Sequence, residues 1–180
     1  MSVAISIIGL NGADKSIICE RLSQYYNVPL LDTDKLLPEL YNKATGEDLT
    51  ESEIFEKYNQ EYFAKIEAKT LEHIRTLIEN NIPEYVLQVG QRVPLNPFAT
   101  EILPNLGTYI YLEYSLESFI KIIKEKNIPG LFSDKESQEK LKQFYNLHHI
   151  KYTEHADITL QPENLSSEEI IKKITANRKI

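Results

Sequence analysis

A chain of 180 residues is long enough for one substantial hydrophobic core and too short for two ordinary domains, so we expect a single domain over residues 1–180. Its apolar fraction of 42 % and charged fraction of 26 % exclude disordered, collagen-like and repeat architectures. The formal net charge of −7 argues against a nucleic-acid-binding surface, because such surfaces neutralise phosphates with clustered Lys and Arg.

The cysteine count and the apolar runs indicate where the protein resides. Cys19 is the only cysteine, which excludes an intrachain disulfide, and we expect it to be a buried helix residue. No apolar run approaches the roughly 18 residues that a membrane helix needs, and the N-terminus lacks a signal-peptide pattern. We therefore predict a cytoplasmic protein with neither a membrane nor a nucleic acid as partner. The oligomeric state does not follow from the sequence, and a monomer is the default expectation.

The first half of the chain alternates between strand and helix patterns. The predicted elements are, in chain order, a strand at 3–10, a helix at 15–26, a strand at 28–31, a helix at 35–43 and two consecutive helices within 50–80. Thr50 and Glu53 have the spacing of a capping box at the start of the first of these two helices.

The second half continues the alternation. Its predicted elements are a strand at 85–89, a short helix at 98–103, a strand at 108–112, a helix at 115–126, a helix at 134–150, a strand at 156–160 and a final helix capped by Ser166 or Ser167. Strands that alternate with helices predict a three-layer α/β/α fold with a five-stranded parallel sheet, because each crossover returns over a face of the sheet. The ligand site should lie at the carboxyl ends of the strands.

The segment Gly9-Leu10-Asn11-Gly12-Ala13-Asp14-Lys15-Ser16 joins the first strand to the first helix and resembles a P-loop. In the pattern G-x-x-x-x-G-K-[ST], backbone N–H groups surround a phosphate, Lys reaches the outer phosphates and the hydroxyl binds Mg²⁺. The pattern therefore predicts a nucleotide site. Its residues are Gly9, Asn11, Gly12, Ala13, Asp14, Lys15 and Ser16.

The second signature glycine of the loop is replaced by Asp14. A side chain restricts the backbone where glycine is permissive, and a carboxylate near the polyphosphate would repel it by a few kcal/mol at an effective dielectric of about 20. The repulsion shrinks if Asp14 points outward. The alternative interpretation is that Gly9 and Gly12 only form a tight turn, with Lys15 on the helix surface.

Asp32-Thr33-Asp34 follows the second predicted strand. Alternate side chains of an extended segment point to opposite sides, so Asp32 could face Mg²⁺ while Asp34 faces an acceptor. The alternative from this pattern alone is a helix N-cap, for which either aspartate is suitable.

These motifs resemble those of the shikimate kinases, and the similarity spans nearly the whole chain. The similar segments are 9–16 for G-x-x-G-x-G-K-[ST], 30–34 for F-x-D-x-D, 46–55 for G-x-x-I-x-E-I-F, 63–67 for F-R-x-x-E, 86–92 for T-G-G-G, 110–112 for V-Y-L, 128–131 for the lid motif R-P-L-L and 148–152 for R-x-x-x-Y. The resemblance implies a P-loop kinase fold of the nucleoside-monophosphate-kinase type, with a substrate-binding helical segment at about 33–65 and a lid at about 126–146.

The resemblance further implies an ATP-dependent phosphotransferase of aromatic amino acid biosynthesis, acting on a hydroxyl of shikimate or a related small molecule. ATP and Mg²⁺ would be its cofactors. In this scheme Lys15 neutralises the β- and γ-phosphates, Ser16 and Asp32 organise Mg²⁺, and Asp34 holds or deprotonates the attacking hydroxyl.

Several positions depart from the family pattern. The two arginines with which such kinases bind the acceptor carboxylate correspond to Ala64 and His148, and the lid arginine corresponds to Ile128. Of the three glycines after the third strand only Gly90 remains, and Arg92 occupies the place of the last.

The available replacements for the lost arginines are Arg92, Lys65 and, if protonated, His148. Together with Asp34 and Gly90, Arg92 and His148 are the candidate acceptor-binding residues. Two interpretations stay open. The chain is a working kinase for shikimate or another hydroxyl compound, such as a sugar acid or a nucleoside, or it is a catalytically impaired paralogue with a binding or regulatory role.

Overall fold

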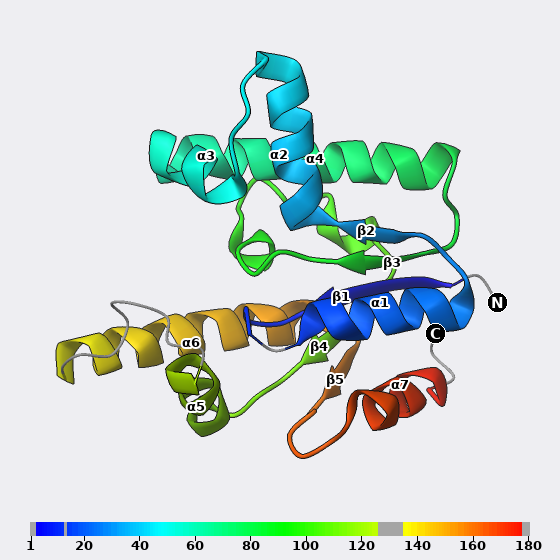
Figure 1. Ribbon diagram of the computed structural model, residues 1–180, viewed down its shortest axis with the longest axis vertical. Helices are drawn as coiled ribbons and strands as arrows, with labels where there is room; N and C mark the ends of the chain where they lie inside the picture. Colours follow the sequence, from blue (N-terminus) through cyan, green and yellow to red (C-terminus); the bar gives the residue numbers. More distant parts are fainter. Residues whose placement is uncertain (1–2, 13, 126–134, 178–180) are drawn as a thin grey trace.

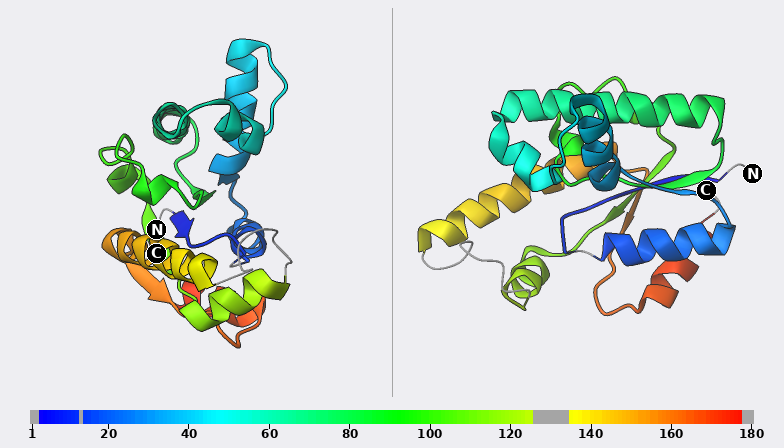
Figure 2. Two further views of the ribbon diagram at one scale, coloured as in Figure 1. Left: turned by 90° about the vertical axis from the view of Figure 1, so that its left-hand side faces the viewer. Right: turned by 45° about the horizontal axis from the view of Figure 1, so that its top comes forward.

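The computed structural model describes residues 3–12, 14–125 and 135–177, which form a five-stranded parallel sheet between two helical layers (Figures 1 and 2). The strands are β1 (Ala4–Ile8), β2 (Leu30–Asp32), β3 (Tyr85–Gln88), β4 (Thr108–Leu112) and β5 (Ile158–Leu160). The helices are α1 (Lys15–Tyr26), α2 (Thr33–Thr45), α3 (Glu51–Lys57), α4 (Gln60–Asn80), α5 (Leu116–Glu125), α6 (Lys135–His155) and α7 (Ser167–Thr175), with short 3₁₀ turns η1 (Val93–Leu95) and η2 (Leu103–Asn105).

The strand order β2-β3-β1-β4-β5 confirms the predicted parallel α/β fold. Alternation of side chains across β1 explains the two apolar layers. Ile5 and Ile7 pack with α1 and α7 on one face, whereas Ile8 belongs to the core shared with α4, α5 and α6 on the other. Cys19 of α1 is fully buried in the first of these layers, as expected.

The register of the central strands determines which side chains meet at the carboxyl edge of the sheet. Gln88 of β3 lies opposite Ile7 of β1 and opposite Asp32 of β2. The residues that follow these positions, Gly9 and Gly90, therefore leave the sheet side by side with the start of α2. This is the edge at which ligands bind in open parallel sheets.

A smaller apolar cluster forms away from the sheet, where α2, α3 and α4 meet (Figure 1). It consists of Leu37, Tyr41, Ile54 and Phe63, with further apolar side chains around it. The predicted capping box fixes the start of α3, because Thr50 accepts from the Glu53 N–H and the Glu53 side chain accepts from the Thr50 N–H. This cluster holds the predicted substrate-binding segment beside the sheet edge.

The loop after β3 is tied to α6. The Tyr152 hydroxyl donates a hydrogen bond of 2.8 Å to the carbonyl of Gln91, and the tyrosine ring is fully buried. Within the described parts of the chain, no helix is both long and apolar enough to cross a lipid bilayer.

The predicted short helix at 98–103 is wrong. The structure has the 3₁₀ turns η1 and η2 on either side of this segment, and no α-helix within it. Asn96 turns the chain by accepting the Phe98 N–H with its side chain, and Pro104 lacks the N–H that a continuing helix would need. The other predicted helices and strands are confirmed, although α6 extends beyond residue 150 and α2 starts earlier, at Thr33.

Candidate active site

The loop between β1 and α1 turns its lysine inward. Gly12 adopts a φ of 95°, which favours glycine, and α1 begins at Lys15. The Lys15 side chain is only 5 % exposed, and its Nζ donates to the carbonyl oxygen of Gly9 at 2.5 Å and to Asn11 Oδ1 at 3.2 Å. The alternative interpretation that places Lys15 on the helix surface is therefore wrong. Ala13 lies outside the described residues.

Burial disfavours the charged form of the Lys15 side chain. Desolvation lowers the pKa of its ammonium group to about 8, although the nearby carboxylates of Asp34 and Asp32 act in the opposite direction. A polyanion bound beside Lys15 would replace the lost solvation. The loop thus has the electrostatic character of a phosphate site.

Asp14 occupies a backbone position that suits glycine better. Its φ of 51° and ψ of 21° are left-handed, and its side chain makes no capping hydrogen bond at the start of α1. After desolvation, the charge of Asp14 is the largest influence that raises the pKa of Tyr114. The expected backbone strain is present, and the carboxylate acts on the side of the loop where Tyr114 lies.

The sequence suggested that the two aspartates after β2 alternate on an extended segment, and the structure shows that they do not. Asp32 ends β2 and is the N-cap of α2, where its Oδ1 accepts from the Asp34 N–H at 3.0 Å. The N-cap alternative is thus correct for Asp32. Asp34 lies in the first helical turn, where burial raises the pKa of its carboxyl while the charge of Lys15 lowers it.

Gly90 is required for space at this edge. A Cβ atom on Gly90 would overlap Oδ1 of Asp34 and come within 3.0 Å of the Thr33 hydroxyl oxygen. The Gly90 N–H donates to that same hydroxyl at 2.8 Å. The glycine therefore brings the loop after β3 into contact with the carboxylate predicted to receive the acceptor proton.

A cavity of about 330 Å³ lies between the β1–α1 loop and Asp34. It is lined by Leu10, Asn11, Gly12, Asp14, Lys15, Ser16, Ile17, Asp34 and Gln88. Sequence reasoning missed Gln88, which is 6 % exposed and whose Oε1 has no hydrogen-bond partner in the structure. Its only sequence signal was a polar residue at the carboxyl end of a buried strand.

The described residues hold no group of three or more His, Cys, Asp or Glu side chains suited to a metal ion. Mg²⁺ in kinases usually takes one or two protein ligands and completes its shell with water and phosphate oxygens. Ser16 lines the small cavity, and Asp32 lies at the end of β2 with its side chain 8 % exposed. Both side chains carry the oxygen donors that Mg²⁺ prefers, but of the two only Ser16 lines the small cavity.

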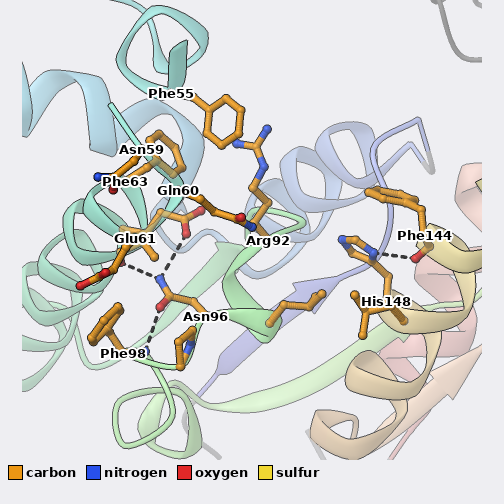
Figure 3. A pocket seen from close by; sticks show the side chains of 15 residues that line it. Phe55, Asn59, Gln60, Glu61, Phe63, Arg92, Asn96, Phe98, Phe144 and His148 are labelled. Atoms are coloured by element: carbon orange, nitrogen blue, oxygen red, sulfur yellow. Dashed lines mark hydrogen bonds between the residues drawn. The ribbon is translucent and has the colours of Figure 1, made fainter. Parts of the chain in front are cut away.

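A second, larger cavity of about 740 Å³ lies between α3, α4, η1 and α6 (Figure 3). It is lined by Phe55, Asn59, Gln60, Glu61, Phe63, Ala64, Glu67, Arg92, Leu95, Asn96, Pro97, Phe98, Phe144, Leu147 and His148. The predicted acceptor residues Arg92 and His148 thus meet here, from opposite walls, together with Ala64.

Arg92 crosses this cavity and is held by aromatic and acidic groups. Its guanidinium carbon lies 4.0 Å from the centre of the Phe55 ring and 5.4 Å from that of Phe63, and Nη1 lies 3.3 Å from Glu51 Oε1. Lys65, the other proposed cation, does not line the cavity and pairs with Glu61 at 2.6 Å. The Lys65 Nζ also lies 5.4 Å from the centre of the ring of Phe98, at the edge of the cavity. Of the two cations, only Arg92 is part of the lining itself.

Glu67 is a second functional candidate that we did not assign, although it is the final position of the F-R-x-x-E-like segment. It is 8 % exposed, and burial raises the pKa of its carboxyl to about 7, while the charge of Arg92 opposes this shift. The Asn96 side chain donates to Glu67 Oε2 at 3.2 Å and to the carbonyl of Ala64 at 2.7 Å.

His148 is buried, with 4 % of its surface exposed. Its Nδ1 lies 2.8 Å from the carbonyl oxygen of Phe144, and because a carbonyl only accepts, this nitrogen carries the proton. Burial lowers the pKa of His148, the hydrogen bond to the Phe144 carbonyl acts in the opposite direction, and the charge of Arg92 lowers the pKa further. The expectation that a protonated His148 replaces an arginine is therefore not supported, because burial favours its neutral form.

Comparison with known proteins identifies the family of this site. The family model for shikimate kinase matches residues 11–179. This chain belongs to the shikimate kinase family. Shikimate kinase of Dictyoglomus turgidum is 29 % identical over 178 residues, covering 97 % of this chain and 96 % of the relative. Shikimate kinase of Dehalococcoides mccartyi is 30 % identical over 170 residues, covering 94 % and 90 %.

Solved shikimate kinases share the fold. The Acinetobacter baumannii enzyme in complex with shikimate has a TM-score of 0.76 at 23 % identity, covering 97 % of this chain and 92 % of that one. The Bacteroides thetaiotaomicron enzyme has a TM-score of 0.77 at 18 % identity, with 96 % of both chains covered. These structures confirm the predicted kinase fold, and the match to the family model supports a shikimate-kinase-like phosphotransferase.

Within this shikimate kinase framework, the two replaced acceptor arginines fall in the larger cavity, whereas the replaced loop glycine, Asp14, lines the smaller one. Ala64 and His148 line the larger cavity, whereas Lys15, Ser16 and Asp34 line the smaller one. Ile128 and the first part of the predicted lid, residues 126–134, lie outside the described residues, whereas 135–146 forms the start of α6. The nucleotide half of the site is thus close to the family pattern, and the acceptor half differs.

Proposed function

We propose that this protein transfers the γ-phosphoryl group of Mg²⁺-bound ATP to a hydroxyl of a small molecule held in the larger cavity. One observation carries the proposal. The buried ammonium of Lys15 and the carboxylate of Asp34 line one cavity, and each shifts the pKa of the other. A cation for the phosphates and a base for the attacking hydroxyl are the two groups that such a transfer needs side by side.

The residues divide the work by position. Lys15 and the loop N–H groups would neutralise charge on the phosphates, and Ser16 and Asp32 would supply oxygen ligands to Mg²⁺. Asp34 would accept the proton of the attacking hydroxyl, a role favoured by its raised pKa. Gly90 would keep that carboxylate in place at the smaller cavity, since any side chain there displaces it.

Shikimate is the first acceptor to test, because the Acinetobacter baumannii relative is solved in complex with it. A coupled assay would follow ADP release with Mg²⁺ATP in the presence and absence of shikimate, and calorimetry would measure ATP binding. We expect Lys15→Met to abolish both signals and Asp34→Asn to abolish turnover with ATP binding retained. Lys121→Met, at an exposed position of α5, is the matched control.

The outcomes separate the two interpretations of the sequence. Acceptor-dependent ADP release that requires Lys15 and Asp34 supports a working kinase. ATP binding without turnover of shikimate, or of any other small hydroxyl compound offered, would support the impaired paralogue. The replacement of the two arginines at positions 64 and 148 favours this interpretation. Absence of ATP binding would refute the nucleotide site itself.

The wider setting belongs to the same proposal. We place the protein in the cytoplasm as a monomer with one domain over residues 1–180, acting on a small molecule in aromatic amino acid biosynthesis. The net charge of −7 supports the absence of a nucleic-acid partner. Light scattering during size-exclusion chromatography would test the monomer.

A further inference from the structure

Four phenylalanine rings contribute to the wall of the larger cavity. Phe55, Phe63 and Phe98 come from α3, α4 and the segment after η1, and Phe144 faces them from α6 (Figure 3). Phe98 is 43 % exposed and Phe144 is 36 % exposed, so apolar surface remains open to solvent. A small polyol carboxylate has little apolar surface to match such a wall. A ligand with an apolar or aromatic group would bury the exposed apolar surface of this wall.

The cationic groups in and near this cavity are already compensated. Among the described residues that line it, Arg92 is the one arginine or lysine, and its guanidinium pairs with Glu51 at 3.3 Å. The same charge also stabilises the ionised form of Glu67, as the direction of its effect on the pKa of that carboxyl shows. The carboxylate of a ligand bound here would share Arg92 with the carboxyl groups of Glu51 and Glu67. The described lining thus does not reproduce a clamp of two arginines.

His148 presents a hydrogen-bond acceptor in place of an arginine. Because Nδ1 donates to the Phe144 carbonyl, Nε2 carries a lone pair, and this atom is buried without any hydrogen-bond partner in the structure. In Figure 3 it points away from Phe144, toward the wall that carries Arg92. A carboxylate oxygen opposite Nε2 would set acceptor against acceptor. An N–H or O–H group would satisfy it.

We propose that the acceptor of this enzyme presents a hydrogen-bond donor, not a carboxylate, to His148, and an apolar or aromatic group to the phenylalanine wall. The ligand class is a neutral hydroxyl compound with an amide or hydroxyl donor and an apolar substituent. This inference rests on the proposed function, because it assigns the acceptor cavity of the same phosphotransfer. His148 is then a specificity-determining residue.

Equilibrium binding of three probes tests this specificity without relying on turnover. The probes are shikimate, its primary carboxamide and its N-benzyl carboxamide, titrated calorimetrically into the full chain with Mg²⁺ADP. We expect the primary amide to bind about tenfold more tightly than shikimate, since one buried acceptor gains a partner, and the benzyl amide to bind more tightly still.

Two variants and one control probe the residues involved. His148→Arg should reverse the order so that shikimate binds best, whereas His73→Arg, on the exposed side of α4, should leave it unchanged. Phe98→Ser changes an already exposed ring, so it should fold and remove most of the advantage of the benzyl group. This second variant keeps the test decisive if His148→Arg fails to fold.

The results also distinguish failure of this inference from failure of the proposed phosphotransfer. Shikimate binding as tightly as the amides, or no binding of either amide, would overturn the inference. An order that His148→Arg leaves unchanged would overturn it too. Tighter binding of the amides without ADP release from Mg²⁺ATP would support the inferred specificity and refute phosphoryl transfer.

Discussion

Replacing Lys15 by Met should make the ligand-free protein more stable at neutral pH, although it removes the group on which nucleotide binding depends. Lys15 is 5 % exposed, and its pKa falls from 10.5 to about 8 on burial. The folded state therefore disfavours the charge that the unfolded chain carries freely. Functional groups held at such a disadvantage are a known source of trade-off between stability and activity.

The magnitude follows from the shift itself. With an unfolded pKa of 10.5 and a folded pKa of about 8, the penalty is roughly 3 kcal/mol at pH 7 and roughly 1 kcal/mol at pH 9.5. It is complete below pH 8 and fades as the pH rises toward 10.5, because the folded lysine loses its proton first. The stability advantage of Lys15→Met over the wild type should thus shrink by about 2 kcal/mol between these two pH values.

Urea unfolding at pH 7 and pH 9.5 measures this change for the wild type and the variant. The methionine also loses the hydrogen bonds to Gly9 and Asn11, but this loss is independent of pH and cancels in the comparison. Lys121→Met, at a side chain that is 77 % exposed, should show no such pH dependence. If the free energy of unfolding depends on pH equally in wild type and Lys15→Met, the claim that burial disfavours the charged form of Lys15 is refuted.

Three further substitutions have expected outcomes. Gly90→Ala should lower kcat about 100-fold in the ADP-release assay by displacing the Asp34 carboxylate; unchanged kcat would show that this contact does not position the base. Asp14→Gly should tighten ATP binding about fivefold in calorimetry, because it relieves a left-handed backbone and removes a carboxylate; an unchanged Kd would contradict both reasons. Thr50→Ala should reduce the free energy of urea unfolding by about 1 kcal/mol through loss of the capping box, with Thr76→Ala, in mid-helix, as the comparison.

Most of the fold could be predicted from local patterns. Apolar runs bounded by Gly9 and Gly90 marked β1 and β3, and their alternation with amphipathic segments required a parallel sheet. The register of that sheet brought Lys15 and Asp34 into one cavity, as the motif order had suggested. The segment around Pro97 was misjudged because it forms short turns held by backbone hydrogen bonds and by the Asn96 side chain, which the local pattern does not show.

The acceptor half of the site was less accessible to sequence reasoning, since it depends on contacts between distant elements. The lowered pKa of His148 follows from its burial, and the nitrogen that carries its proton is set by a carbonyl of its own helix. Glu67 and Gln88 became candidates only once their burial was known. Residue type alone gave no warning that Lys65 would turn to Glu61 while Arg92 entered the cavity.

The bond between Tyr152 and the Gln91 carbonyl has a mechanical consequence. It joins the helix that carries His148 to the loop that carries Arg92, so it ties two opposite walls of the larger cavity to each other. If the cavity widens for a bulky acceptor, the third wall, formed by α3 and the start of α4, is the one free of this tie. That wall is anchored by the small cluster around Tyr41 and Phe63. Hinge motion in this protein should therefore concentrate at the two ends of α3, leaving the sheet edge still.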